Sequence, residues 1–295
     1  MLTRRRAPRV RPEPRQALAD VLAAPRFEVL PLPGIEEEVA AHVPPQAKVT
    51  VTASPRQGMA ATLETAGMLA SQGVQVVPHL SARMLRDEAH LKDVLDEVLA
   101  HGIHEVFVIG GDADEPAGDF AGSLDVLEAM DRLGYELVVG IAGYPEPHPK
   151  IPDDLTVQAM WDKRRYASYI VSQICFRPSV FVRWVERVRR RGIALPIYVG
   201  VPGPARTRQL LKVSRRIGVG ESTRVLAHHG RGMLRLAQPG EWRPDAIVEG
   251  VAPYMGLPQY GVSGLHMYTF NDVAAAERWR RSMVARMRPG QELES

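Results

Sequence analysis

LKDVLDEVLAHGIHEVFV, residues 91–108, contains the unit that decides the fold of this 295-residue chain. Gly102 stands between two runs of different period, and glycine just past a helix readily adopts the left-handed conformation that ends it. A short, largely apolar run, 103–108, follows at once. The apolar residues before the glycine recur at the spacing of one helix face, and they are Leu91, Val94, Leu95, Val98 and Leu99. The stretch therefore predicts a helix that turns directly into a strand.

The same order of helix, glycine and strand occurs three more times, around Gly73, Gly134 and Gly192. Amphipathic runs precede the last two of these glycines, and Ser123 and Ser179 stand where their N-caps are expected. Strands separated by one-sided helices pair in parallel through right-handed crossovers. The repeated unit predicts alternating strands and helices around a parallel sheet.

Extending this pattern along the chain yields eight strand candidates. They lie near residues 27–30, 49–53, 75–79, 105–109, 136–141, 168–174, 195–199 and 264–270. No Gly-x-Gly-x-x-Gly follows the first candidate, which argues against a Rossmann sheet. Eight strands over this length predict a single-domain α/β fold, the (β/α)8 TIM barrel, with extra helices between residues 204 and 258.

The barrel domain is predicted to span residues 26–288. Residues 1–25 are rich in arginine and proline, and we interpret them as a flexible tail; an arm that touches nucleic acid or an acidic partner is the alternative. Residues 289–295 are predicted to be a flexible C-terminus. The formal charge of +3 is concentrated in the tail, so the barrel has no signature of a nucleic-acid protein.

Composition predicts a cytoplasmic globular protein. Apolar residues make up 45% of the chain and charged residues 24%, which suits a domain with a large core. No stretch of about 18 uncharged apolar residues and no secretory apolar region is present, so no membrane partner is expected. The single cysteine, Cys175, excludes an internal disulfide and suits a reducing compartment. A homo-oligomer is compatible with these features.

Polar residues stand at the ends of most predicted strands, where the active site of a barrel of this type lies. They are Glu28, Thr52, His79, Asp112, Tyr144 with His148, Gln173 and Tyr268. A surface loop could supply any one of them, but seven strand ends in register predict an enzyme's active site.

Glu28 lies between Phe27 and Val29 in a short strand, where its carboxyl group is expected to point into the barrel mouth. A carboxyl held partly away from water keeps its proton to higher pH and becomes a useful general acid. The alternative is a solvated loop acid, or an ion pair with a nearby arginine. We favour the general acid.

Asp112 follows two glycines, and the absence of a side chain at Gly111 lets a ligand approach the backbone, although a simple turn has the same composition. A buried Gln173 is costly without partners, which favours a ligand contact. His79 is interpreted either as a site residue or as a core histidine. No metal site is predicted, because the His228–His229 pair lacks a third ligand at metal spacing. With no activated nucleophile in the sequence, the site suits chemistry carried by a bound cofactor.

Seven short segments, taken together, resemble methylenetetrahydrofolate reductases in sequence and in order. They are FEVLP (27–31), VT (51–52), PHL (78–80), GD (111–112), AGYPEPHP (142–149), SQ (172–173) and LHMYTFN (265–271). The likeness extends over essentially the whole predicted barrel. The Tyr-Pro-Glu-x-His-Pro and His-x-Tyr-Thr-x-Asn runs are its most specific parts.

The resemblance implies a (β/α)8 barrel that holds FAD and reduces 5,10-methylenetetrahydrofolate to 5-methyltetrahydrofolate, with NADH or NADPH as electron donor. It implies that Glu28 and Asp112 are the catalytic residues, Glu28 as the general acid and Asp112 beside flavin and pterin. The implied flavin-binding residues are Thr52, His79, Gly111, Asp112, Tyr144 and His148. The implied folate-binding residues are Gln173, Tyr268 and Asn271.

Some positions depart from the family's pattern. Gly110 stands where the family usually has an arginine, and Asp272 follows Asn271 where the family has another arginine. Three alternatives to the reductive reaction remain. They are the same chemistry run oxidatively in demethylation, a flavin-less folate-binding or regulatory barrel, and a different flavin barrel such as a proline-dehydrogenase-like enzyme.

Overall fold

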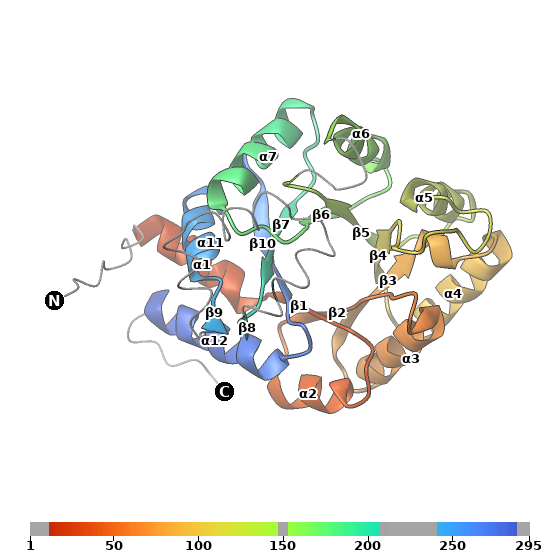
Figure 1. Cartoon of the computed structure of the whole chain (residues 1–295), viewed down its shortest axis with the longest axis horizontal. Coiled ribbons are helices and arrows are strands. Elements are labelled where there is room, and N and C mark those ends of the chain that lie inside the picture. The colour runs from red at the N-terminus through yellow and green to blue at the C-terminus, as the bar shows by residue number, and fades with distance from the viewer. Residues whose placement is uncertain (1–11, 147–152, 207–209, 211–240, 288–295) are drawn as a thin grey trace.

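A computed structural model describes residues 12–146, 153–206, 210 and 241–287 of the chain. Eight parallel strands close into a barrel in the order β1-β10-β7-β6-β5-β4-β3-β2, and helices surround it (Figure 1). In chain order the barrel strands are β1 (Arg26–Val29), β2 (Lys48–Val51), β3 (Gln75–Ser81), β4 (Glu105–Ile109), β5 (Val138–Gly143), β6 (Tyr169–Ser172), β7 (Ile197–Pro202) and β10 (Val262–Tyr268). The predicted (β/α)8 barrel is confirmed.

The helices around the barrel follow the order expected from the sequence. They are α2 (Ile35–His42), α3 (Gly58–Ser71), α4 (Glu88–Ala100), α5 (Ser123–Arg132), α6 (Asp153–Lys163), α7 (Pro178–Arg190), α11 (Asp245–Val251) and α12 (Val273–Met287), with 3-10 turns η1 (Ala82–Met84) and η2 (Ala252–Tyr254). The four predicted helix-ending glycines have φ values between 71° and 82°. This left-handed backbone is the conformation for which glycine is favoured at these positions.

The predicted flexible tail is wrong from residue 12 onward. Residues Pro12–Ala23 form helix α1, which packs against α12 and β10 (Figure 1). Leu18 and Leu22 are fully buried in this contact, and Arg280 donates to the carbonyl of Leu22 at 2.9 Å. In the sequence, the arginine-rich composition around the helix obscured its short apolar pattern. Residues 1–11 and 289–295 lie outside the described residues.

The two predicted N-caps are also wrong. Gly122 caps α5, and its N–H donates to the carboxylate of Asp125 at 2.9 Å. Ser123 is the first helical residue, and its hydroxyl accepts from Lys163 instead. Helix α7 starts at Pro178, whose fixed φ suits the first turn of a helix. Between β7 and β10 the structure describes a small antiparallel pair, β8 (Ala205–Arg206) with β9 (Glu241–Trp242), and α11.

Alternation along each strand separates the outer core from the barrel interior. In β4, Val106 and Val108 face the helices, whereas Phe107 joins an interior cluster with Tyr169 and Val171. This parity sends every second side chain of a strand into the barrel. The residues that reach the mouth of the barrel are therefore set by the period of two.

Charged and aromatic side chains fill the amino end of the barrel. Arg26 donates to Glu105 at 2.6 Å and to the hydroxyl of Tyr169 at 3.1 Å. Its guanidinium lies 4.2 Å from the ring centroid of Tyr169 and 4.4 Å from that of Tyr198. Lys48 also pairs with Glu105. Because these residues are the first or second of their strands, the cluster fills the amino end of the barrel, opposite the end at which barrels of this type carry their active sites.

No helix among the described residues has the length and apolar character needed to cross a lipid bilayer.

Candidate active site

Glu28 is the centre of a polar cluster at the carboxyl ends of the strands. Its Oε2 atom lies 3.0 Å from Nε2 of His266 on β10 and 3.7 Å from Nε2 of His79 on β3. The Glu28 side chain is 17% exposed, whereas the two imidazoles are 1% and 4% exposed. Strand β1 pairs with β10 so that Glu28 lies beside Tyr268. The carboxyl group is thus partly exposed at the carboxyl ends of the strands and lies against two buried imidazoles.

His79 is held neutral by its surroundings. Burial lowers the pKa of His79 from 6.5 to about 4, although the negative charge of Glu28 acts in the opposite direction. Its ring packs against Phe107 with centroids 4.8 Å apart. At neutral pH this imidazole can offer Glu28 a hydrogen bond or a polar surface, but no positive charge.

Tyr268 spans the mouth from β10 to β6. Its hydroxyl donates to the carbonyl of Ser172 at 3.1 Å, and its ring meets His266 edge-on with centroids 4.9 Å apart. A Cβ at Gly200 would lie 2.0 Å from the Ser172 carbonyl oxygen and 3.0 Å from the Tyr268 ring. Gly200 therefore leaves the space that Tyr268 occupies. Burial raises the pKa of Tyr268 well above its usual value, and the charge of Glu28 adds to the effect.

Tyr144 and Asp112 form the opposite side of the mouth. Burial raises the pKa of Tyr144, and the negative charge of Asp112 raises it further, so the two side chains lie within electrostatic reach. Asp112 itself is exposed, in the loop after β4. Gly111 before it has φ 96°, and a Cβ there would lie 2.0 Å from the hydroxyl of Ser81. Glycine is thus required for this close approach of two strand ends.

Arg83, in the loop after β3, holds the loop that carries Asp112. Its guanidinium donates to the carbonyls of Ala113, Asp114 and Ala121, at 2.7 Å for Ala113 and 3.2 Å for Ala121. Its backbone N–H donates to Gly110 at 3.0 Å. One side chain therefore joins the loops after β3 and β4.

The remaining predicted site residues lie at the same end but do not all face the cluster. Thr52 is partly buried, directly after β2, and its carbonyl accepts from Thr62. The side-chain oxygen of Gln173 accepts from the backbone N–H of Ile174 at 2.9 Å. His148 lies outside the described residues.

Asn271 uses its side chain on the protein's own backbone. Its Oδ1 accepts from the N–H of Leu30 at 2.7 Å, and its Nδ2 donates to the Leu30 carbonyl at 3.0 Å. The residue has φ 64°, a left-handed conformation that asparagine tolerates better than most residues. This geometry ties the loop after β10 to the loop after β1.

Sequence reasoning missed three residues of this site, which are His266, Ser81 and Arg83. His266 could have been found, since the period of two puts it on the same face of its strand as Tyr268. The same period of two along β3 would have placed Ser81 on the same face as His79. Arg83 carried no signal, because its partners are backbone carbonyls far along the chain.

Three buried polar atoms under the mouth have no hydrogen-bond partner among the described residues. They are Nε2 of His79, Oγ of Ser81 and Nδ1 of His266. Buried polar atoms are usually satisfied by protein, water or ligand. This floor therefore has spare capacity to bind polar groups.

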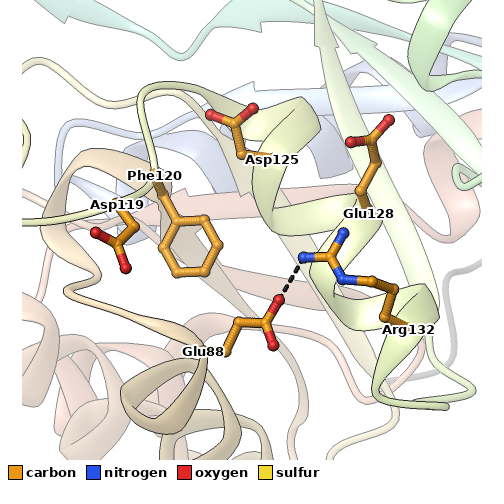
Figure 2. A pocket seen from close by; sticks show the side chains of 6 residues that line it. All are labelled: Glu88, Asp119, Phe120, Asp125, Glu128 and Arg132. Carbon is orange, nitrogen blue, oxygen red and sulfur yellow. Dashed lines mark hydrogen bonds and ion pairs between the residues drawn. The ribbon is translucent and has the colours of Figure 1, made fainter.

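A separate pocket of about 420 Å³ lies on the outside of the barrel, between α4 and α5 (Figure 2). Glu88 and Arg132 form an ion pair across it, and buried Phe120 lines one wall. Asp119, Asp125 and Glu128 complete the lining. None of the predicted site residues lines this pocket. No group of three or more His, Cys, Asp or Glu in the described part of the chain is arranged to hold a metal ion.

Comparisons with known proteins point to one family. The model of the family described as methylenetetrahydrofolate reductase matches residues 35–279. Methylenetetrahydrofolate reductase 2 of Saccharomyces cerevisiae is 24% identical over 141 residues, which are 44% of this chain and 23% of the yeast protein. Methylenetetrahydrofolate reductase (NADH) 1 of Arabidopsis thaliana is 26% identical over 218 residues, 67% of this chain and 36% of the plant protein. The matched part is thus less than half the length of either relative.

Among solved structures, a 2,3-dimethylmalate lyase superimposes with a TM-score of 0.47 at 11% identity, covering 95% of this chain and 90% of that chain. This likeness carries no argument about function.

Proposed function

This chain belongs to the methylenetetrahydrofolate reductase family, and from that membership we propose that it reduces 5,10-methylenetetrahydrofolate to 5-methyltetrahydrofolate with NADH or NADPH as electron donor. The observation that carries the proposal is the Glu28 carboxyl group, partly exposed at the mouth and flanked by buried imidazoles. Pure folate binding would not need such a group. Proton transfer by a positioned side chain does need it.

Glu28 is the proposed general acid. The product has its methyl group on N5, so the bond that breaks joins the methylene carbon to N10. N10 takes the proton from Glu28 as the five-membered ring opens, and the methylene carbon becomes an N5 iminium. A hydride then adds to this carbon and yields the methyl group. Glu28 is left as a carboxylate and recovers its proton from solvent through the open mouth.

The other mouth residues have proposed binding roles. Asp112, exposed on the loop that Arg83 holds, would contact the pterin. Gln173, directly after β6, and Tyr268, at the end of β10, would contact the folate. Asn271 would act indirectly, because its amide is already bound to Leu30.

The residues at Thr52, His79 and Tyr144 suit FAD better than the residue at Gly110 does. Thr52, His79 and Tyr144 present hydroxyl and imidazole groups of the kind that hold a flavin ring, and His79 has a buried nitrogen without a hydrogen-bond partner among the described residues. The fit is poorer at Gly110, which stands where the family usually has a flavin-contacting arginine, and nearby Arg83 is engaged with backbone carbonyls. When bound, FAD would relay hydride from the nicotinamide to the folate.

The test is an assay of the purified protein with 5,10-methylenetetrahydrofolate and NADH or NADPH, with and without added FAD. Chromatography would quantify 5-methyltetrahydrofolate, and the visible spectrum would report bound flavin. Product formed together with bleaching of a flavin spectrum supports the reaction and the relay. Product formed by a colourless protein keeps the reaction and removes FAD from it. No product under any of these conditions overturns the proposal and leaves the folate-binding barrel.

A further inference from the structure

Both imidazoles that flank Glu28 lie against the same carboxyl oxygen. His266 and His79 approach Oε2 at 3.0 and 3.7 Å. Among the described residues no hydrogen bond reaches Oε1. The two oxygens of this carboxyl group therefore differ in their surroundings: Oε2 lies against both imidazoles, and Oε1 has no hydrogen bond among the described residues.

The hydrogen bond between Glu28 and His266 determines the tautomer of the imidazole. When the carboxyl group carries its proton on Oε1, or carries no proton, Oε2 can only accept, so Nε2 of His266 carries the hydrogen of this bond. Nδ1 of His266 is buried and has no partner among the described residues. A second proton on Nδ1 would place an unsatisfied donor in the barrel floor, which is unfavourable. The arrangement favours the neutral Nε2–H tautomer.

The neighbours of His266 hold its ring in place. Tyr268 packs edge-on against it and is anchored through its hydroxyl to Ser172 on β6. The backbone of Glu28 is fixed as well, since its carbonyl accepts from both the N–H and the hydroxyl of Thr269. Tyr268 thus restrains the imidazole of His266, and Thr269 restrains the backbone that carries the Glu28 carboxyl group.

Few titratable groups face this pair. His79 faces Glu28 from β3, and Tyr268 faces it from β10. Tyr144, after β5, faces Tyr268. All three are neutral near pH 7, because burial lowers the pKa of His79 and raises the pKa values of the tyrosines. When the Glu28–His266 contact is altered, the resulting change in pH dependence is therefore not obscured by a charge on His79, Tyr144 or Tyr268 near pH 7.

We propose that His266 is a positioning residue for Glu28: its Nε2–H holds Oε2 in the floor, so that Oε1 carries the transferable proton toward the mouth. In the step, the Oε1–H bond breaks and the N10–H bond of the folate forms. The carboxylate that remains is stabilised by the Nε2–H donor on Oε2. That N10 of the folate accepts the proton rests on the proposed function, whereas the positioning of Glu28 by His266 does not.

The first test compares His266→Phe, which keeps a ring but removes the donor, with His266→Gln, which keeps a side-chain N–H. His104→Gln, at an exposed histidine, is the control. We expect His266→Phe to lower kcat about ten- to a hundredfold and to change KM little. The alkaline limb of the pH–rate profile of His266→Phe should move to higher pH, because the charged form of Glu28 loses the hydrogen bond from Nε2–H. His266→Gln should recover part of the rate. Equal losses in both variants with an unmoved limb would overturn the proposal.

A second test needs no turnover and separates this inference from the reaction. Nitrogen-15 NMR of the histidine side chains, assigned with the His266 variants, would report the tautomer in the wild-type protein. We expect Nε2–H for His266, with a resonance that shifts in Glu28→Gln. An Nδ1–H tautomer, or a His266 resonance unaffected by Glu28→Gln, would overturn the inference even if the enzyme is active. An inactive wild-type protein with the expected spectrum would overturn only the proposed reaction.

Discussion

Two buried histidines approach the same oxygen of Glu28 in different surroundings. His266 lies within hydrogen-bond distance of Glu28, whereas His79 lies beyond it. His79 packs against Phe107 in the barrel interior, and burial lowers its pKa to about 4. The difference arises from about 0.7 Å in the distance to one oxygen atom and from the surroundings of each ring. Position, rather than residue type, decides which imidazole lies within hydrogen-bond distance of the carboxyl group.

The lowered pKa of His79 predicts how stability depends on pH. In the unfolded chain His79 binds a proton near pH 6.5, and in the folded protein only near pH 4. Between these values the unfolded chain holds the extra proton, so the free energy of unfolding falls as the pH falls from 6.5 to 4. The loss attributable to His79 is at most about 3 kcal/mol. Chemical denaturation at several pH values should show a smaller loss for His79→Gln than for wild type.

The control for this prediction is His104→Gln, which replaces an exposed histidine. It should keep the wild-type pH dependence. Identical curves for wild type and His79→Gln between pH 4 and 6.5 would contradict the account of His79.

At the scale of the element, local signals predicted most of the barrel. Gly102 and its three counterparts end helices as expected, and all eight strand candidates overlap observed strands. What failed depended on contacts distant in sequence. Helix α1 is held by α12 at the other end of the chain, and Ser123 accepts from Lys163 instead of capping its own helix. Local helix propensity carries no information about partners that are distant in the sequence.

The loops after β3 and β4 form one unit through Arg83, which predicts the effect of removing its guanidinium. Arg83→Met should release three carbonyls, cost about 1–2 kcal/mol of stability, and raise hydrogen exchange over residues 110–122. Because this loop carries Asp112, the KM for folate should rise. Arg83→Lys keeps the charge but not the three-way geometry, so it should recover little. Unchanged exchange in Arg83→Met would show that the loop is held by other contacts.

At the scale of the whole molecule, barrel closure and the site share the seam between β1 and β10. Glu28 and Tyr268 lie side by side in the register, and Asn271 and Thr269 bind the backbone at the end of β1. The sequence predicted which strand ends carry polar groups, because the carboxyl ends of barrel strands meet at one mouth. It could not predict that the Asn271 amide bonds Leu30, since this depends on the positive φ of the loop.

The seam predicts a cost in stability at Asn271. Asn271→Gly keeps the left-handed backbone and loses the amide contacts, for about 1–2 kcal/mol, whereas Asn271→Ala adds backbone strain and should cost about 2–3 kcal/mol. Urea denaturation of both variants measures this difference. If both are as stable as wild type but bind folate poorly, Asn271 contacts the substrate and the seam role is wrong.

Glu28 is proposed to supply the proton for reduction of the folate. The most direct measurement is the rate of 5-methyltetrahydrofolate formation by wild type, Glu28→Gln and the exposed control Glu64→Gln, with folate affinity measured by calorimetry on the same samples. We predict that Glu28→Gln lowers kcat by at least about a hundredfold and leaves the folate Kd within a few-fold, and that Glu64→Gln matches wild type. A Glu28→Gln protein that turns over at the wild-type rate would rule out proton donation by Glu28.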